Sequence, residues 1–512
     1  MGKRIIIVGG GVAGLSTGIY GQMNGFETEI FEMHNTTGGQ CTAWERKGYR
    51  FDYCLHWLVG TADGVLNKLW KELDVINKDT IIYDHEVHSG YTDEQGNEFI
   101  IYANIDRWEQ SLLEMAPEDK VSITKMCRDM RKVASFQPFG DISSFGEMIS
   151  FTGNLLKLSA SLPILLKYGR KTCQDYFAKL KFKNTKLNYF LNSLIGDKDF
   201  SALAYLMMLG WFHSKNAGYL MGGSLPLARR MEERYKSLGG KVLTGKRVVK
   251  ILTINDKAVG IQLSDGSVIK SDYVISAADG HATIFDMLEG KYVSEKIQYA
   301  YKNWDLFTPL VQVSFGINKE VPAGFPSKIH LVKDFSIGST KLGTGYSFMN
   351  YSFDPSMAPR GKTVIVLRYE SAWDVWKDMT KDQYKAEKET IKTQATAILE
   401  KHYPGITEFI EVVDIATPST NVKYTGVWKG SYEGFFPSSK NITKSLKNTL
   451  PGLGNFFMAG QWLSPGGGLP PSALSGKVAI KQICSQEKQK FTVTVGEQQI
   501  RNAKVPEEEL SV

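Results

Sequence analysis

Short apolar runs bounded by glycines alternate with longer amphipathic stretches along this chain, and the pattern is clearest at its beginning. Residues 5–8 are four apolar residues in a row, which predicts a short buried strand. Glycines follow at positions 9, 11 and 14, and residues 13–24 continue in a pattern that predicts a helix. A second run at residues 28–32 predicts another strand, which ends in Glu32. Strand, glycine turn, helix and strand in this order predict the first unit of a parallel α/β sheet.

The glycine turn has the spacing G-x-G-x-x-G at Gly9, Gly11 and Gly14. Gly9 permits the tight turn, Gly11 lets the backbone approach a pyrophosphate, and Gly14 lets the helix pack against the strand. The diphosphate would lie against the free N–H groups and the positive end of that helix. Glu32 stands 18 positions after Gly14, a spacing that suits a carboxylate accepting hydrogen bonds from ribose hydroxyls. These residues predict a dinucleotide site, and alone they leave NAD and FAD open.

Farther along the chain, the pattern divides into blocks. Residues 86–214 are mostly helical by pattern, whereas strand-like runs at 310–317, 346–353 and 363–369 precede a helix predicted over 381–402. We therefore expect an α/β protein with a discontinuous Rossmann-like dinucleotide-binding domain, an antiparallel-sheet substrate domain and a helical insert. The expected boundaries are 1–85, 215–300 and 440–485 for the first domain, 301–439 for the substrate domain, 86–214 for the insert and 486–512 for a polar tail.

The composition is typical of a soluble globular protein, with 512 residues of which 42% are hydrophobic and 22% charged. Neither a signal peptide nor an apolar run of membrane-spanning length is evident, so we expect a cytoplasmic protein. The five cysteines are scattered without CxxC pairs, which indicates reduced thiols rather than a zinc site or a disulfide framework. The histidines show no metal-like clustering, and we assign no metal.

Positive charge is concentrated at residues 151–190, where eight Lys or Arg stand against the single Asp175. No nucleic-acid-binding motif accompanies this charge, so we expect no nucleic acid partner. Two interpretations stay open: an amphipathic helix packed on its own domain, or reversible contact with an anionic membrane surface. In the second, apolar side chains dip below the headgroups and cations meet phosphates; the residues are Leu155, Leu156, Leu162, Ile164, Leu165, Leu166, Lys157, Lys167, Arg170, Lys171, Lys179, Lys181 and Lys183.

Two further segments favour FAD over NAD. A second glycine pair, Gly38-Gly39, follows the second strand closely, which suits a ligand whose remaining half runs back along the protein. Residues 454–484 then repeat the logic of strand, glycine turn and helix, with a strand at 456–459, a flexible loop at 466–468 and a helix over 472–484. The N-terminus of this helix could face a negative flavin carbonyl. In an NAD enzyme, the last strand and helix of the chain would have no reason to pack beside the first strand and helix, so this repeat favours FAD.

With these segments the chain resembles the FAD-dependent family of phytoene desaturases, carotenoid isomerases and retinol saturases, within the amine-oxidase-like flavoproteins. Further matches are a GG-helix-GG-strand unit at 218–251, "DPSMAPRG" at 354–361, "TPST" at 417–420 and "GSYEG" at 430–434. The resemblance runs from about residue 3 to 484. It implies noncovalent FAD held by Gly9, Gly11, Val12, Ala13, Gly14, Glu32, Met33, Gly38, Gly39, Gln40, Val248, Gly460, Gln461, Gly468, Leu469 and Pro470.

The resemblance also implies a reaction and its residues. Flavin would transfer a hydride while the protein orients the substrate and moves protons, for which His56, Tyr53, His213 and Tyr219 are the candidates, each with a structural role as the alternative. The expected function is saturation, isomerisation or desaturation of carbon–carbon bonds in a long hydrophobic isoprenoid, polyene or lipid. A flavin amine oxidase or protoporphyrinogen-oxidase-like enzyme and a non-catalytic prenyl-binding escort protein are the alternatives.

Two departures from the family pattern bear on the direction of the reaction. Gln40 stands where desaturases commonly have an arginine, and Gln461 stands where the family often has an acid. The missing arginine, together with "FDYCLHW" at 51–57, favours the saturase and isomerase side, whereas Gln461 can still hydrogen-bond a ribityl hydroxyl. No second Rossmann motif is present, so the electron donor or acceptor stays unknown, and quinone, oxygen or a partner flavoprotein would all fit.

Overall fold

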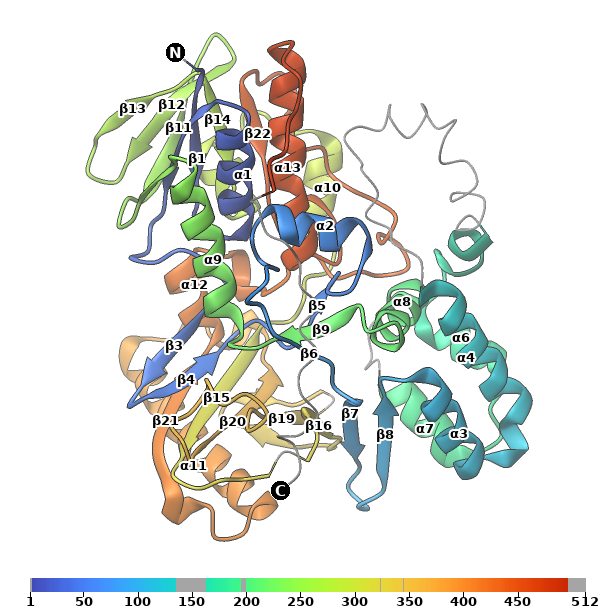
Figure 1. The fold of residues 1–512 in the computed structure, drawn as a ribbon. Helices are drawn as coiled ribbons and strands as arrows, with labels where there is room; N and C mark the ends of the chain where they lie inside the picture. The colour runs from blue at the N-terminus through green and yellow to red at the C-terminus, as the bar shows by residue number, and fades with distance from the viewer. Residues whose placement is uncertain (1, 135–162, 195–198, 323, 344, 496–512) are drawn as a thin grey trace.

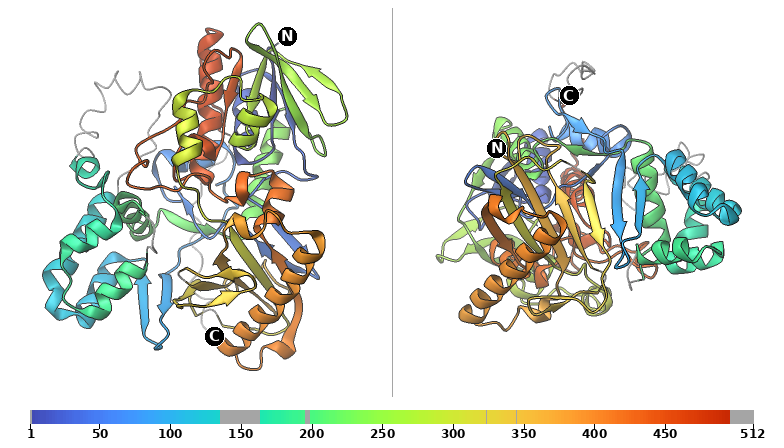
Figure 2. Two further views of the ribbon diagram at one scale, coloured as in Figure 1. Left: turned by 180° about the vertical axis from the view of Figure 1, so that it is seen from behind. Right: turned by 90° about the horizontal axis from the view of Figure 1, so that it is seen from below.

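The computed structural model describes residues 2–134, 163–194, 199–322, 324–343 and 345–495. Figure 1 shows a sheet covered by helices at the top, a second large sheet at the bottom, and a group of helices at the right. Figure 2 gives the same three regions from behind and from below.

The upper sheet has five parallel strands in the order β10-β2-β1-β14-β22. Its central strand carries Ile5, Ile6 and Ile7 with no exposed surface, as the continuous apolar run predicts for a strand covered on both faces. Widely separated stretches of chain meet in this sheet, and the predicted Rossmann-like α/β fold is confirmed. The strands are β1 (Arg4–Val8), β2 (Glu27–Phe31), β10 (Lys241–Leu243), β14 (Tyr273–Ser276) and β22 (Phe456–Met458).

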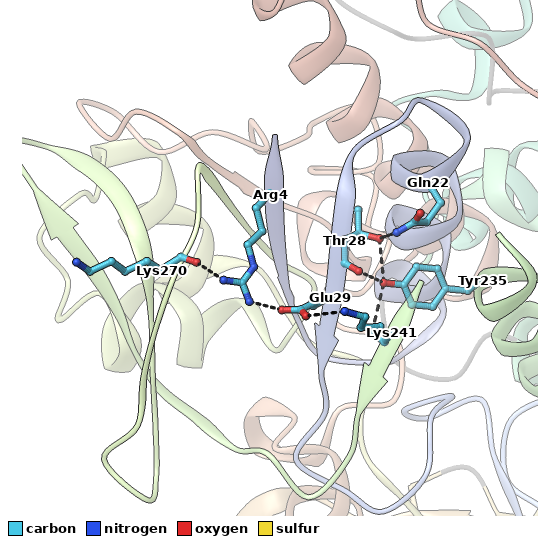
Figure 3. Close-up of polar contacts among 7 residues, drawn as sticks. All are labelled: Arg4, Gln22, Thr28, Glu29, Tyr235, Lys241 and Lys270. Atoms are coloured by element: carbon cyan, nitrogen blue, oxygen red, sulfur yellow. Dashed lines mark hydrogen bonds and ion pairs between the residues drawn. The ribbon is translucent and has the colours of Figure 1, made fainter. Parts of the chain in front are cut away.

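Helices α1 (Val12–Met23), α9 (Ser224–Ser237) and α13 (Leu469–Gln486) lie together beside this sheet (Figure 1). The hydroxyl of Ser16 donates to the carbonyl of Ala473 at 2.6 Å, which joins α1 to α13. The hydroxyl of Tyr235 on α9 donates to the carbonyl of Thr28 on β2 at 2.8 Å (Figure 3). In the same view Arg4 of β1 donates to Glu29 of β2 at 2.5 Å. These bonds thus join α1 to α13, α9 to β2, and β1 to β2.

Smaller elements surround the upper sheet. An antiparallel sheet of β11 (Val248–Ile254), β12 (Lys257–Leu263) and β13 (Val268–Lys270) lies at its outer side, and a hairpin of β3 and β4 and a sheet in the order β5-β9-β6 lead toward the lower sheet (Figure 1). The remaining bounds are β3 (Ala43–Arg46), β4 (Tyr49–Asp52), β5 (Leu58–Val59), β6 (Ile82–Tyr83), β9 (Ala217–Leu220), α2 (Gly64–Glu72), α10 (Glu295–Asn303) and α12 (Pro418–Thr425).

The lower sheet has seven strands in the order β21-β15-β20-β19-β16-β7-β8. Its pairs are antiparallel except for β16 and β7. Helix α11 (Lys381–His402) lies beside it and begins and ends as predicted. The predicted antiparallel sheet is therefore confirmed, with strands β7 (Val87–Thr92), β8 (Glu98–Tyr102), β15 (Leu310–Ile317), β16 (Ser327–His330), β19 (Tyr346–Asn350), β20 (Thr363–Glu370) and β21 (Ile410–Ala416), and a separate pair β17 (Ser336–Ile337) and β18 (Thr340–Lys341).

The helical region at the right of Figure 1 comes from the stretch expected to be an insert. Its helices are α3 (Ile105–Met115), α4 (Lys120–Ala134), α6 (Cys173–Leu180), α7 (Thr185–Ser193) and α8 (Ala202–His213), with α8 packed against α4. Residues 163–168 are also helical. The first part of this stretch differs from the expected helical pattern, because β7 and β8 extend the seven-stranded sheet through β16.

Two boundaries at the end of the chain differ from the sequence prediction. Helix α13 begins at Leu469 rather than at residue 472, because two prolines occupy its first turn, where their missing N–H groups cost nothing. The segment after α13 contacts the body of the protein: Thr492 donates its backbone N–H to Asn24 at 2.7 Å, and Phe491 lies beside Tyr20. Residues 496–512 of the predicted tail lie outside the described residues.

Candidate functional site

A cavity of ≈2120 Å³ extends between the upper sheet, the lower sheet and the helical region. At one end it is lined by Val8 and Phe31, the last residues of β1 and β2. Ligands of open α/β sheets bind at this carboxyl edge of the strands. At the other end the walls come from α8, through Leu203 and Met207, and from the seven-stranded sheet. We call the first part the cradle and the second the tunnel.

Two glycines of the first motif have different surroundings. A Cβ on Gly14 would lie 1.9 Å from the carbonyl oxygen of Gly9, so helix and strand could not pack as closely with any larger residue. A Cβ on Gly11 would meet no protein atom nearer than 3.8 Å, and Gly11 lines the cavity. Gly14 is therefore required for packing, whereas the space beside Gly11 is available to a ligand.

Glu32 lies at the end of β2 with 7% of its surface exposed. Its carboxylate accepts the backbone N–H of Gly10 at 2.6 Å and that of His34 at 2.8 Å. Burial raises the pKa of Glu32, while these N–H groups and the charge of His34 oppose the rise. The N–H groups fix the carboxylate at the cavity wall, with lone pairs left to accept hydroxyl groups of a ligand.

The second glycine pair packs directly on the first motif. Gly38 donates its N–H to the carbonyl of Gly10 at 2.9 Å, and Gly38 also forms a bridge with Gly11. Gln40, the next residue but one, accepts a hydrogen bond from the side-chain amide of Gln461 at 3.1 Å. The two glutamines that distinguish this chain thus hold the N-terminal and C-terminal cradle segments together.

The C-terminal segment closes the cradle. Gly460 donates its N–H to Ser475 at 2.7 Å, and Gly468 stands at the N-cap of α13 without a side-chain cap. Pro470 and Pro471 carry no N–H, so Leu469 supplies the N–H of the first helical position. The cofactor residues expected from sequence that line the cavity are Gly9, Gly11, Val12, Ala13, Glu32, Met33, Gly38, Gly39, Gln40, Val248, Gly460, Gln461, Gly468, Leu469 and Pro470.

Of the four candidate proton carriers, Tyr53, His56 and Tyr219 line the cavity. Burial raises the pKa of Tyr53 to about 12, and its hydroxyl has no hydrogen-bond partner among the described residues. His56 lines the cavity, and the surrounding protein, which removes water from the ring, together with Arg368 and His88 lowers its pKa to about 3. At neutral pH both groups are therefore uncharged.

The other two candidates are placed differently. Tyr219 lines the cavity, but its hydroxyl donates to the buried Asp354 at 3.0 Å. Burial and nearby carboxylates raise the pKa of Tyr219. His213, at the end of α8, accepts the backbone N–H of Ile105 at 3.2 Å and is not among the described residues that line the cavity. Tyr219 and His213 thus have structural partners, whereas Tyr53 does not.

Sequence reasoning missed Arg368, a buried cation on β20 that lines the tunnel. Its guanidinium donates to Gln312 at 2.8 Å and to the backbone carbonyls of Asp52 and Tyr53 at 3.1 and 2.9 Å. Asp52 in turn accepts the N–H and hydroxyl of Ser224, at 2.6 and 2.7 Å. Arg368 therefore positions the segment that carries Tyr53. The available signal was a lone arginine within the apolar run 363–369.

Other chemistry-bearing residues of the cavity wall were also missed. Asp279 follows β14 and accepts the N–H groups of Ala282 and Trp428, each at 2.9 Å, and burial raises its pKa to about 6. His85 and His88 line the tunnel, where burial lowers each pKa to about 4. Glu433, within the quoted "GSYEG", lines the cavity beside Gly468.

Two searches of the described ranges found no candidate. No group of three or more His, Cys, Asp or Glu side chains there could hold a metal ion. Nor is any described helix both long and apolar enough to cross a membrane.

Known proteins were compared with the chain by sequence. It is 22% identical to prolycopene isomerase 1, chloroplastic, of an Oncidium hybrid cultivar, over 94% of this chain and 83% of that protein. It is 23% identical to 4,4'-diaponeurosporene oxygenase of Staphylococcus haemolyticus, over 95% of this chain and 98% of that protein. It is also 23% identical to 1-hydroxycarotenoid 3,4-desaturase of a Flavobacterium species, over 94% and 99%.

Solved structures share the fold. An oxidoreductase from Methanosarcina mazei matches with a TM-score of 0.57 and 18% identity, over 93% of this chain and all of that one. Putrescine oxidase bound to putrescine matches with a TM-score of 0.58 and 12% identity, over 95% and 99%. The model of the family "Flavin containing amine oxidoreductase" matches residues 12–484. The chain therefore belongs to this family of flavin-containing oxidoreductase enzymes.

Proposed function

We propose that this enzyme binds FAD noncovalently and acts on carbon–carbon bonds of a long hydrophobic isoprenoid or polyene. We favour reduction or isomerisation of C=C bonds over desaturation as the reaction. The observation that carries the proposal is one continuous cavity that joins a dinucleotide cradle to an apolar tunnel. The flavin would supply hydride chemistry when bound, and the protein would supply orientation and protons.

The cradle fits FAD. The open space at Gly11, the carboxylate of Glu32 and the free N-terminus of α13 lie along one cavity wall, suited to pyrophosphate, ribose and a flavin carbonyl. At ≈2120 Å³ the cavity exceeds the ~300–1,000 Å³ of an ordinary small-molecule pocket, so a second elongated ligand has room beside the cofactor.

The tunnel suits an apolar substrate. Its walls include Trp211 and Met207 of α8 and Met349 of β19, and the histidines among them are held neutral by burial. A long hydrocarbon loses its water shell on entering such a tunnel, which favours the binding of an apolar substrate. The carotenoid relatives carry names that fit this kind of substrate.

The pair Gln40 and Gln461 supports our preference for reduction or isomerisation over desaturation. Their side chains bond to each other, and Gln40 also donates to the carbonyl of Ser431 at 3.3 Å. At position 40, where the resemblance places the arginine of desaturases, this chain has an uncharged amide.

The test uses the purified protein with its bound chromophore. A flavin absorption spectrum is expected, and reduced enzyme mixed anaerobically with a lipid extract should yield products heavier by two hydrogens or isomers of unchanged mass. A Gly11→Val protein without flavin serves as the control. Formation of a conjugated product from a saturated isoprenoid by oxidised enzyme would reverse the order, and oxidation of amines with no change in any lipid would overturn the proposal.

We also propose that the enzyme works in the cytoplasm at an anionic membrane surface. Residues 135–162, with the predicted contacts Leu155, Leu156, Lys157 and Leu162, lie outside the described residues. Within 163–190, Leu166 is 77% exposed, while its neighbour Leu165 lines the tunnel, which would place a tunnel opening beside the membrane.

The cations of this segment divide into two kinds. Lys167 pairs with the buried Asp129 at 3.2 Å, which favours a structural role for this lysine. Arg170, Lys179, Lys181 and Lys183 are exposed. Burial and the neighbouring lysines 179, 167 and 125 lower the pKa of Lys171, so positive charge is crowded here. Each cation near an anionic membrane contributes about 1 kcal/mol.

Vesicle co-sedimentation tests the membrane contact. Anionic liposomes should retain the protein at low salt, and the triple variant Arg170→Glu/Lys179→Glu/Lys181→Glu should stay in solution. Lys385→Glu/Lys392→Glu/Lys401→Glu on α11, far from α6 in Figures 1 and 2, is the matched control and should still bind. Equal behaviour of the two triple variants would leave the basic segment as an ordinary solvated face.

A further inference from the structure

The carboxyl group of Glu433 lies where the cradle and tunnel meet. A Cβ on Gly468, the N-cap of α13, would lie 3.2 Å from Oε1 of Glu433, and one on Gly467 would lie 2.2 Å from its backbone carbonyl. The two glycines therefore leave the space that Glu433 occupies. Both Glu433 and Gly468 line the cavity, so this carboxyl group borders the end of the cradle that suits the flavin ring.

Glu433 differs from Glu32 and Asp279 of the cavity wall, and from the buried Asp52, in having no partner among the described residues. Glu32, Asp52 and Asp279 each accept two or more backbone N–H groups. No hydrogen bond or ion pair among the described residues reaches the carboxyl group of Glu433. The side chain of Glu433 is half-buried on the cavity wall, and unpaired ionisable groups with a shifted pKa that line a cavity concentrate at functional sites.

The groups around Glu433 leave its charge uncompensated. The loop 461–468 and the first two turns of α13 carry no charged side chain before Lys477. The cavity is also lined by Glu370 and Arg368 of β20 and by Tyr53. The neighbouring residue Tyr432 lines it as well, and the pKa of Tyr432 is raised first by burial and then by the charge of Glu433. Burial alone raises the pKa of Glu433 to about 7. Both protonation states are therefore accessible near neutrality, unlike those of His56 and Tyr53.

We propose that Glu433 is the proton-carrying residue of the reaction, acting at the junction of flavin site and substrate tunnel. The inference rests on the proposed function. Reduced flavin would supply a hydride when bound, and in the reduction of a C=C bond Glu433 would donate its carboxylic proton, so that two C–H bonds replace the π bond. The carboxylate left behind regains a proton from water, so two electrons and two hydrogens are balanced.

The first test is spectroscopic and independent of substrate. In the flavin-loaded enzyme the visible absorption should shift with pH, with a midpoint near 7, because the charge of Glu433 changes beside the ring. Glu433→Gln should abolish the shift, Glu433→Asp should keep a titration, and Glu370→Gln, which removes another cavity carboxylate, should leave it unchanged. A midpoint near 6 that survives in Glu433→Gln would assign the titration to Asp279 and overturn the proposal.

The second test separates this inference from the proposed function. With the lipid substrate, Glu433→Gln should lower kcat by about 10²-fold or more with flavin content and KM retained, and the fall in wild-type kcat above pH 7 should disappear. Equal kcat in Glu433→Gln and wild type would overturn the inference while the function stands. A spectral titration lost in Glu433→Gln, with no change in any lipid, would keep the proton site and overturn the function. If Glu433→Gln loses flavin, Glu433→Met serves for both tests.

Discussion

The two ends of the cavity are built in different ways. The cradle is built from glycine turns whose backbone N–H groups and open Cα positions face the ligand, and most of its parts follow a short strand directly. The tunnel is built from side chains of α8, β19, β20 and the segment 53–58, which lie far apart along the chain. In the function proposed above, cofactor recognition would therefore depend on local backbone geometry, whereas substrate recognition would depend on how distant elements pack.

The acids of the two ends show the same contrast. Glu32 is held by two backbone N–H groups, so its carboxylate has a fixed position for accepting hydroxyls. Glu433 has no such donors and a pKa raised to about 7 by burial, so its charge state is variable. A fixed acceptor suits binding, and an unpaired acid suits proton transfer.

The largest effect is expected from closing the cradle. Gly11→Val should yield folded protein without flavin, because the new side chain meets no protein atom nearer than 3.8 Å at its Cβ but occupies the ligand's space. The ratio of visible flavin absorbance to protein absorbance, with circular dichroism as the folding check, measures this. Gly324→Val, where a Cβ has nothing within 4 Å, is the control and should stay yellow. A fully yellow Gly11→Val protein would place the pyrophosphate elsewhere.

Removing the fixed acid should have a smaller effect on the cradle. Glu32→Ala would lose the proposed contact with the ribose; one hydrogen bond to a charged acceptor contributes about 1.5–3 kcal/mol, so the loss of one such bond should weaken flavin binding roughly tenfold to a hundredfold. Dialysis followed by flavin titration measures the change. The flavin affinity of Glu32→Gln should lie between those of Glu32→Ala and the wild type. An affinity unchanged in both variants would show that Glu32 does not contact the flavin cofactor.

The variable acid should make stability depend on pH. The pKa of Glu433 is raised from 4.5 to about 7 in the folded protein, so its contribution is fully present below pH 4.5 and is lost as pH rises through about 7. The loss is at most about 3 kcal/mol, reduced by solvent in the cavity. Melting of flavin-free protein from pH 5 to 8 should show Glu433→Gln gaining stability relative to wild type. A difference in stability between Glu433→Gln and wild type that does not change from pH 5 to 8 would mean that Glu433 is ionised over this whole range.

The smallest effects should come from the two cavity tyrosines, and they should differ. Tyr219→Phe removes a donor from the buried Asp354, which should cost about 1–2 kcal/mol of unfolding free energy. Tyr53→Phe removes a hydroxyl without a partner and should change stability by less than about 0.5 kcal/mol. Urea unfolding compares them. Equal losses would show that Tyr53 has a partner as strong as Asp354.

Much of the cradle could be predicted from the sequence, because strand, glycine spacing and terminal acid lie within some 30 residues and each has a backbone requirement. The strands at 310–317 and 363–370 and the helix at 381–402 were also readable from apolar runs and helical periodicity. The position of β7 and β8 in the lower sheet was not, because pairing with β16 depends on a partner more than 200 residues away.

The sequence by itself determined the family, the α/β architecture and the residues that can face a dinucleotide, since short-range backbone geometry demands glycine, turn and acid at set intervals. Only the tertiary structure decided which polar side chains are satisfied. It paired Tyr219 with Asp354 and His213 with the backbone of Ile105, and it brought Arg368 to the segment of Tyr53. Within the part of the chain that the structure describes, it also left the carboxyl group of Glu433 without a partner, beside Gly468. Burial and hydrogen-bond satisfaction depend on neighbours from distant elements, and no local pattern encodes them.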